Sequence, residues 1–346
     1  MAGVAAGCVI GVDLGGTKLL AGAVDADLAV HHRTNRPALG LEQMELVEMV
    51  VHAVEGVRTA VGGDVSAVGF GIPCTFDART GMAVQAVNLP LHDIRFADVM
   101  AERLELPVVV DNDANCAVLA EARAGAAQGC EEVALLTLGT GIGGGLFLRG
   151  EVYRGWLGAG AELGHMVVER DGRPCQGNCP NRGCLESVAS GTALVREVSL
   201  AVARRPDTAV GLALEAGREL TGPLITELAR AGDPVARDAI EVIGRALGVG
   251  VSNLVNIFNP QVVVIGGGVS AAGDLLLSPA REVVAERALR PGRDVVRIVA
   301  AAFGAEAGMV GAAILARERP PGVPSAAGGP APAAGSDLAF TQRDTE

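Results

Sequence analysis

The sequence predicts an α/β protein made of two similar halves with a cleft between them. Predicted strands alternate with amphipathic helices, a pattern typical of α/β proteins whose strands pair largely in parallel. A strand–glycine turn–strand unit at residues 8–30 recurs at 133–155, where LTLGTG aligns with VDLGGT at an offset of 124 residues. Glycine-rich turns follow three of the predicted strands, at 13–18, 137–145 and 266–268.

The first half opens with the apolar run 8–30, in which Gly15 and Gly16 permit the positive φ angles of a tight hairpin. Apolar residues at helical spacing predict an amphipathic helix over 41–61, carried by Leu41, Met44, Val47, Val51 and Val54. The segments that follow are a strand at 66–73, a helix at 96–106, a short buried strand at 107–113 and a helix at 114–125.

The second half continues from 133–155 through a mostly helical region at 210–256, a strand and glycine turn at 261–270, and a closing helix at 303–318. The Pro-, Ala- and Gly-rich tail after Glu318 is expected to be disordered. At about 100–200 residues per domain, 346 residues predict two domains. We expect a small lobe over 1–118, a large lobe over 119–303, a helix at about 304–318 that packs back on the small lobe, and a tail over 319–346.

Composition narrows the functional class. Forty acidic residues against 28 basic residues give a formal charge of −12, which disfavours a large nucleic-acid interface. No apolar run reaches the roughly 18–20 uninterrupted residues of a membrane span, and the N-terminal segment lacks the basic region of a secretory signal. Seven cysteines, an odd number, argue against a disulfide framework. We therefore expect a soluble cytoplasmic protein that binds small molecules rather than nucleic acid or membranes.

The glycine-rich turns are candidate phosphate sites. In DLGGTK the two glycines let backbone N–H groups approach a phosphate, Lys18 is the only lysine of the chain, and Asp13 suits Mg²⁺ or its water shell. An ordinary hairpin with a surface lysine is the alternative. TLGTGIGGG at 137–145 matches G-x-G-x-x-G, yet a dinucleotide site needs a helix after the glycines, whereas a strand is predicted here. GGG at 266–268 lies between a strand and a helix and suits a nucleotide base or ribose.

DNDAN at 111–115 lies at the carboxyl end of a buried strand, where ligands of α/β sheets collect. A helix follows, so Asp111 or Asp113 has the alternative role of capping that helix. Capping accounts for one polar residue of this group. A hydrogen-bonding pair for a hydroxylated substrate accounts for more of them, and we favour that interpretation.

One histidine and three cysteines, His165, Cys175, Cys179 and Cys184, are spaced by ten, four and five residues. Four such ligands fill a tetrahedral Zn²⁺ site and leave no open position, which is typical of structural zinc. A catalytic zinc would need a vacant position, and the deaminase pattern H-x-E with P-C-x-x-C is missing from the sequence. Glu162 and Glu186 flank this loop and are candidates to contact the same substrate as Asp113.

Together these motifs resemble the ROK family of sugar kinases. The resemblance covers roughly residues 8–318 and rests on DLGGTK, VDNDAN, LGTGIGGG, the AELGH segment at 161–165 and the cysteine loop ending in GCLE. It implies the actin/hexokinase-like (ribonuclease H-like) two-lobe fold, with duplicated α/β halves around a cleft. The activity it implies is ATP-dependent phosphorylation of a hexose hydroxyl.

The resemblance also implies a role for each motif. Asp113 would be the catalytic base and Asn112 would bind sugar hydroxyls. Glu162, His165 and Glu186 would bind the sugar near its anomeric end, with His165 also ligating zinc. The phosphates of ATP and its Mg²⁺ would be held by the first two glycine turns, through Asp13, Gly15, Gly16, Thr17, Lys18, Gly139, Thr140, Gly141 and Gly143. Adenosine would lie against Gly266, Gly267 and Gly268.

Two positions depart from the family pattern. The first two cysteines of the family's zinc loop are two residues apart, whereas Cys175 and Cys179 are four apart. We still expect zinc to be bound by His165, Cys175, Cys179 and Cys184. Cys74 stands where many relatives have glycine.

Glucose is the expected substrate, and the alternatives are N-acetylmannosamine, N-acetylglucosamine, fructose and mannose, whose kinases share this motif set. The family also includes sugar-responsive repressors, so a sugar-binding regulatory protein without kinase activity is the alternative of another class. Because DLGGTK begins at residue 13, we expect no DNA-binding domain ahead of it. The resemblance further suggests a homodimer or a dimer of dimers.

Overall fold

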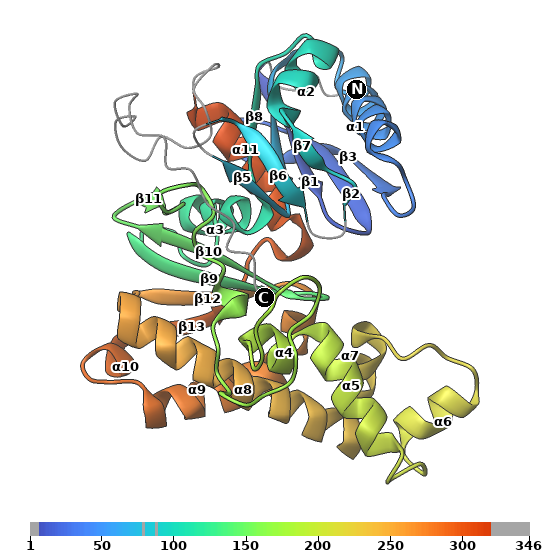
Figure 1. The fold of residues 1–346 in the computed structure, drawn as a ribbon, viewed down its shortest axis with the longest axis vertical. Coiled ribbons are helices and arrows are strands. Elements are labelled where there is room, and N and C mark those ends of the chain that lie inside the picture. The colour runs from blue at the N-terminus through green and yellow to red at the C-terminus, as the bar shows by residue number, and fades with distance from the viewer. Residues whose placement is uncertain (1–6, 78–79, 87–88, 320–346) are drawn as a thin grey trace, which may run out of the picture.

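The computed structural model describes residues 7–77, 80–86 and 89–319, which form two α/β lobes stacked along the long axis of the molecule (Figure 1). The sheet of the first lobe has the order β3-β2-β1-β4-β8. Its strands are β1 (Cys8–Leu14), β2 (Lys18–Val24), β3 (Val30–Pro37), β4 (Val65–Ile72) and β8 (Val108–Asn112). The β1–β2–β3 meander is antiparallel, and β1, β4 and β8 run parallel.

The second lobe repeats this arrangement strand for strand, with the order β11-β10-β9-β12-β13. Its strands are β9 (Glu132–Leu138), β10 (Ile142–Leu148), β11 (Glu151–Val152), β12 (Val262–Gly266) and β13 (Arg297–Ala300). Here too the first three strands in the chain are antiparallel, and β9, β12 and β13 run parallel. The duplication predicted from VDLGGT and LTLGTG is therefore confirmed at the level of topology.

Helices cover both faces of the two sheets. In the first lobe α1 (Gln43–Ala60) and α2 (Phe96–Leu104) pack on the outer side. The outer side of the second sheet carries the larger helical layer, made of α4 (Leu185–Ala189), α5 (Gly191–Val202), α7 (Gly222–Arg230), α8 (Pro234–Phe258) and α9 (Asp274–Arg287), with α6 (Ala209–Glu215) and α10 (Gly292–Val295) at its edges. Short 3₁₀ helices are η1 (Leu163–His165), η2 (Gly268–Ala272) and η3 (Gly304–Glu306).

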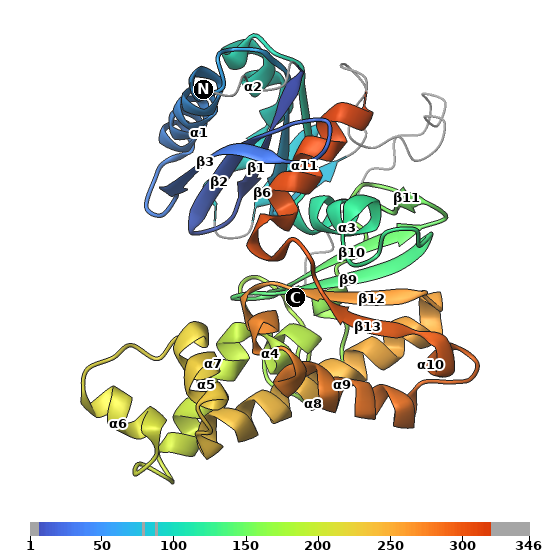
Figure 2. The ribbon, with the colours of Figure 1, turned by 180° about the vertical axis from the view of Figure 1, so that it is seen from behind.

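Two helices, α3 (Asp113–Ala124) and α11 (Ala307–Glu318), lie side by side between the sheets (Figure 2). α11 packs on β1 and β4, and α3 packs on β9 and β10. Their backbones approach so closely that a Cβ atom at Gly311 would overlap the carbonyl oxygen of Cys116. The predicted lobe boundary at 118–119 falls inside α3, so this helix belongs to the junction between the lobes. Its first residue is Asp113.

The buried face of α1 differs from the prediction. Val47 and Val54 are buried as expected, but Met44 is 55% exposed, and the rest of the face is formed by Leu46, Val50, Ala53 and Val57. The strands β5 (Cys74–Asp77), β6 (Met82–Ala86) and β7 (His92–Ile94) form a separate small antiparallel sheet that was not predicted from the sequence.

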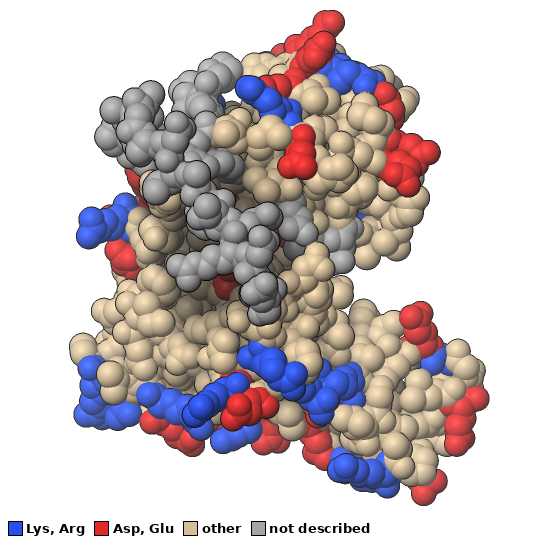
Figure 3. All heavy atoms as spheres, in the orientation of Figure 1, with Lys and Arg blue, Asp and Glu red and all other residues tan. Residues whose placement is uncertain are grey.

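Two properties of the molecule bear on its partners: the distribution of charged side chains and the presence of a long apolar helix. On the face seen in Figure 3, basic and acidic side chains are intermixed along the lower lobe. Among the described helices, α8 alone is long and apolar enough to suit a membrane span, and 56% of that apolar window is buried. Its buried side chains pack against α9, α5, α4 and α7. The tail, expected to be disordered, lies outside the described residues from 320 onward.

Candidate active site

Carboxylates from two strand ends of the first lobe meet at the start of α3. Asp13 lies in β1, and Asp113 follows β8 as the first residue of α3. Burial is the main cause that raises the pKa of Asp13 to about 7; the negative charge of Asp113 contributes to this shift, and Lys18 opposes it. The two carboxylates therefore share one electrostatic environment, with the only lysine of the chain close to them.

The cap of α3 is Asn112. Its side-chain oxygen accepts hydrogen bonds from the backbone N–H of Ala114 at 2.9 Å and of Asn115 at 3.3 Å. Capping by Asp111 or Asp113, the alternative considered above, is therefore wrong, because the N-cap is Asn112. Burial is the main cause that raises the pKa of Asp113 to about 6; the charge of Glu162 contributes to this shift, and the backbone N–H of Ala114 opposes it.

Three of the four predicted sugar-binding residues, Glu162, His165 and Glu186, lie together on the second lobe. Glu162 immediately precedes η1, which ends at His165, and Glu186 lies on α4. Burial raises the pKa of Glu162, His165 lowers it and the charge of Glu186 raises it. Since the charge of Glu162 also acts on Asp113, the structure brings all four groups into one region although they come from three separate segments.

The predicted zinc ligands also converge. One ligand atom each of His165, Cys175, Cys179 and Cys184 lies within 4.8 Å of the other three. His165 Nδ1 is 3.5 Å from the Cys175 Sγ, and the Sγ atoms of Cys179 and Cys184 are 3.9 Å apart. Ligand atoms around a tetrahedral zinc lie about 3.5–3.8 Å apart, given metal–ligand bonds of about 2.0–2.3 Å. The set therefore fits zinc, and the wider spacing between Cys175 and Cys179 does not exclude Cys175 from it.

The remaining cysteines lie elsewhere: Cys8, Cys74 and Cys116 are buried, and Cys130 is half-buried.

Glu186 links the cysteine cluster to the second glycine turn. Its Oε2 accepts a hydrogen bond from the backbone N–H of Ile142 at 2.8 Å, and its Oε1 lies 3.6 Å from the Sγ of Cys175. A Cβ atom at Gly141 would overlap the carboxylate of Glu186. This position requires glycine because the carboxylate occupies the space that a side chain would need.

Each glycine turn has its own local structure. The first is a hairpin between β1 and β2, closed by the Gly15 N–H to the Lys18 carbonyl at 2.9 Å, with Lys18 exposed. The second leads into β10 rather than a helix, so the dinucleotide-binding alternative is excluded. In the third, Gly267 has φ +79° and η2 begins at Gly268, so a short helix follows the strand as predicted.

The second turn is also joined to α5. The N–H of Gly191 donates to the carbonyl of Gly139 at 2.8 Å, and the Thr192 hydroxyl donates to the carbonyl of Thr140 at 2.8 Å. These bonds hold the turn from its outer side.

Arg154 is a residue of this region that the sequence motifs do not reveal. Its Nη2 lies 2.6 Å from Asp111 Oδ2, and the ion pair joins the segment after β11 to β8 of the other lobe. Arg154 belongs to none of the motifs, and an arginine within a glycine-rich loop gives little indication of its partner 43 residues away.

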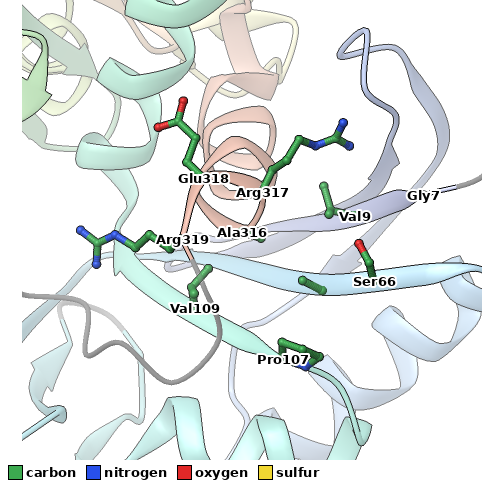
Figure 4. Close-up of a pocket in the computed structure, with 10 residues that line it drawn as sticks. Gly7, Val9, Ser66, Pro107, Val109, Ala316, Arg317, Glu318 and Arg319 are labelled. Carbon is green, nitrogen blue, oxygen red and sulfur yellow. The ribbon is translucent and has the colours of Figure 1, made fainter.

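A separate hollow of about 430 Å³ lies at the end of α11, away from these residues. Figure 4 shows its walls, formed by Val9, Ser66, Pro107, Val109 and the charged residues Arg317, Glu318 and Arg319. No residue predicted to bind sugar, nucleotide or metal lines it.

Comparison with known proteins gives a consistent assignment. The sequence model of the ROK family matches residues 9–319. The glucokinase of Streptomyces coelicolor is 38% identical over 322 residues, which are 91% of this chain and 99% of that protein. The glucokinase of Thermotoga maritima is 35% identical over 313 residues, 90% of this chain and 98% of that protein.

Among solved structures, a ROK family glucokinase from Streptomyces griseus in complex with glucose and AMPPNP superposes with a TM-score of 0.82. The two sequences are 38% identical, and the match covers 90% of this chain and all of the other. This similarity confirms the actin/hexokinase-like two-lobe fold that the motifs implied. The chain belongs to the ROK family.

Proposed function

We propose that this protein is an ATP-dependent sugar kinase that phosphorylates glucose, with Asp113 as the base. The observation that carries the proposal is the convergence of Asp113, Glu162, His165 and Glu186 beside the two glycine hairpins. The similarity to glucokinases over nine-tenths of the chain supports glucose as the acceptor and ATP as the donor.

The reaction needs little beyond positioning and charge stabilisation. The carboxylate of Asp113 takes the proton of the acceptor hydroxyl while that oxygen bonds to the γ-phosphorus. The bond from the γ-phosphorus to the bridging oxygen breaks, and ADP leaves with the electron pair. Backbone N–H groups of the turns at 13–18 and 137–145, together with Lys18, stabilise the phosphate charge, and adenosine lies against Gly266, Gly267 and Gly268. Asp13 would hold Mg²⁺, which neutralises phosphate charge when bound.

The observed hydrogen bonds indicate which atoms of the proposed sugar-binding residues remain available to the sugar. The cap of α3 uses the side-chain oxygen of Asn112, so its amide nitrogen remains to donate to a sugar hydroxyl. His165 directs Nδ1 toward Cys175, which leaves Nε2–H for the sugar. Zinc held by His165, Cys175, Cys179 and Cys184 would order this loop, and the carboxylates of Glu162 and Glu186 accept from hydroxyls near the anomeric carbon.

The experiment is a measurement of Mg-ATP-dependent ADP release with glucose, mannose, fructose, N-acetylglucosamine and N-acetylmannosamine. We expect a clear preference for glucose, since a polar site built for one hydroxyl pattern rejects analogues by up to about 10⁴-fold. A preference for an N-acetyl sugar would instead assign the protein to the aminosugar kinases. Sugar binding without ADP release from any sugar would support the regulatory alternative and contradict the kinase.

We further propose a cytoplasmic homo-oligomer, a dimer or a tetramer, acting at the entry of glucose into glycolysis. Exposed apolar side chains near the end of α8 and around α10 support self-association: Ile257 is 66% exposed, and Leu289 and Val295 are each 69% exposed. Light scattering during size-exclusion chromatography tests this, and a monomer at micromolar concentration would contradict it.

A further inference from the structure

Arg154 and Asp111 form a buried ion pair across the junction of the two lobes. Nε and Nη2 of Arg154 lie 2.7 and 2.6 Å from the same carboxylate oxygen, Oδ2, while Nη1 donates to the carbonyl of Val152 at 3.0 Å. The two side chains are 16% and 7% exposed. In every other arginine–carboxylate pair among the described residues, both side chains are at least 28% exposed.

On the first lobe, this pair leads directly into the catalytic turn. The second oxygen of Asp111, Oδ1, accepts the backbone N–H of Asn112 at 2.8 Å and the side-chain Nδ2 of Asn115 at 2.9 Å. Asn112 in turn caps the helix that begins with Asp113. One oxygen of Asp111 is therefore held by the other lobe, and the second holds the turn that carries Asp113.

On the second lobe, the backbone of Arg154 closes a loop that ends two residues before Glu162. Its backbone carbonyl accepts the N–H of Gly160 at 2.9 Å, so residues 154–160 form a loop closed at its base. The next residue, Ala161, has φ +66°, a left-handed conformation that costs energy for a residue with a side chain, and Glu162 follows it. The backbone of Arg154 thus fixes the base of the loop that precedes Glu162, while its side chain contacts Asp111.

We propose that Arg154 is a positioning residue, which acts through Asp111 to place Asp113 and Asn112 relative to Glu162. This inference rests on the proposed kinase function. A carboxylate buried like that of Asp111 needs a charged partner, and the guanidinium supplies two donors in a fixed geometry. Without Arg154, Asp111 loses the compensation for its charge and the turn is no longer tied to the opposite lobe. A displacement of about 1 Å at a reacting group can cost about 10²-fold in rate.

The test compares Arg154→Met, Arg154→Lys, Asp111→Asn and the double variant Arg154→Met/Asp111→Asn with the full-length protein. Arg205→Met is the matched control, since Arg205 pairs with Asp238 at 2.6 Å but both side chains are exposed. For each variant, kcat and the KM for glucose are measured at 25 °C, together with the melting temperature and circular dichroism to confirm that the sample is folded.

We expect Arg154→Met to lower kcat by about 10- to 100-fold, more than it changes the KM for glucose. Arg154→Lys should recover part of kcat because it keeps the charge. The double variant should be no slower than the slower single variant, because both substitutions remove one interaction. Arg205→Met should retain wild-type kcat.

A folded Arg154→Met that keeps kcat within about twofold of wild type would overturn the inference. So would a drop in melting temperature with unchanged kcat at 25 °C, or fully additive losses in the double variant. If Arg154→Met does not fold, Asp111→Asn decides by the same criteria. Failure of the wild-type protein to phosphorylate any sugar would instead overturn the proposed function, so the two failures are distinguishable.

Discussion

The carboxylate of Glu186 accepts a hydrogen bond from the backbone N–H of Ile142 at 2.8 Å. Glu186 lies two residues after the cluster residue Cys184, and Ile142 begins the strand that follows the second glycine turn. One side chain therefore joins the proposed zinc loop, the proposed sugar site and the turn proposed to hold phosphate. Sugar and nucleotide would be bound by groups that share a single rigid contact.

Substitution of Gly141 by alanine tests this contact. The new Cβ atom would overlap the Glu186 carboxylate, so we expect a loss of about 1–3 kcal/mol of stability and weaker glucose binding. Gly139→Ala is the matched control in the same turn, since its Cβ would meet no heavy atom within 4 Å. Thermal melts and glucose titrations check both. Equal melting temperatures for the two variants would show that Glu186 adapts to the added methyl group.

Asp113→Asn should remove the base while keeping the shape of the turn. Loss of a general base lowers turnover by about 10²–10⁴-fold. The cap by Asn112 and the bonds of Asp111 do not involve the Asp113 carboxylate, so glucose affinity should change little. Steady-state kinetics and calorimetric glucose titration measure the two effects. Turnover near that of wild type would contradict the assignment of Asp113 as the catalytic base.

The pH dependence of kcat/KM should have an acid limb. Asp13 and Asp113 have pKa values raised to about 7 and about 6, and both must be ionised to hold Mg²⁺ and to accept the hydroxyl proton. We therefore expect kcat/KM to fall as the pH drops from about 7 to below 6, at saturating Mg-ATP. A profile that stays flat down to pH 5 would contradict the buried environment of these carboxylates.

The raised pKa of Asp113 also leads to a prediction for the stability of the fold. A carboxyl group whose pKa is higher in the folded state than its ordinary 3.8 destabilises the fold once it ionises. The cost is complete above pH 6 and disappears toward pH 4. Asp113→Asn should therefore melt a few degrees above wild type at pH 8, and this difference should shrink as the pH falls from 6 to 4.

Asp207→Asn, in an exposed turn before α6, is the control for that measurement and should show no comparable trend. A difference between Asp113→Asn and wild type that is independent of pH would show that the gain comes from packing rather than from the charge.

Zinc content distinguishes the cluster cysteines from the others. Cys175→Ser should lower the zinc bound per chain and weaken glucose binding roughly 10- to 100-fold, the effect of losing one charge-assisted hydrogen bond. The physical reason is that His165 and Glu186, which both contact Cys175, lose their fixed orientation. Cys130→Ser, outside the cluster, should retain zinc and glucose affinity.

Removal of zinc with a chelator should reproduce the Cys175→Ser effect. Full zinc content in Cys175→Ser would remove Cys175 from the ligand set.

Local patterns in the sequence were sufficient for most of the framework. The strands and glycine turns around Asp13, Gly139 and Gly266 could be predicted because turn residues and apolar runs act over a few neighbouring residues. The strand β3 could not, since VHHRTNRP is a polar edge strand whose side chains are mostly exposed. The helix α1 was found but its buried face was rotated, because the position of the neighbouring sheet selects which apolar side chains are covered.

The sequence by itself determined which residue types are available to the proposed site, since acid, histidine and cysteine residues at fixed spacings limit the chemistry that they can perform. Only the tertiary structure decided how those groups are held. The bond from Ile142 to Glu186 spans 44 residues, and the pair of Arg154 with Asp111 spans 43. Neither contact can be predicted from local spacing in the sequence. Each contact forms only when the two separate sheets pack around α3 and exclude water from the charges between them.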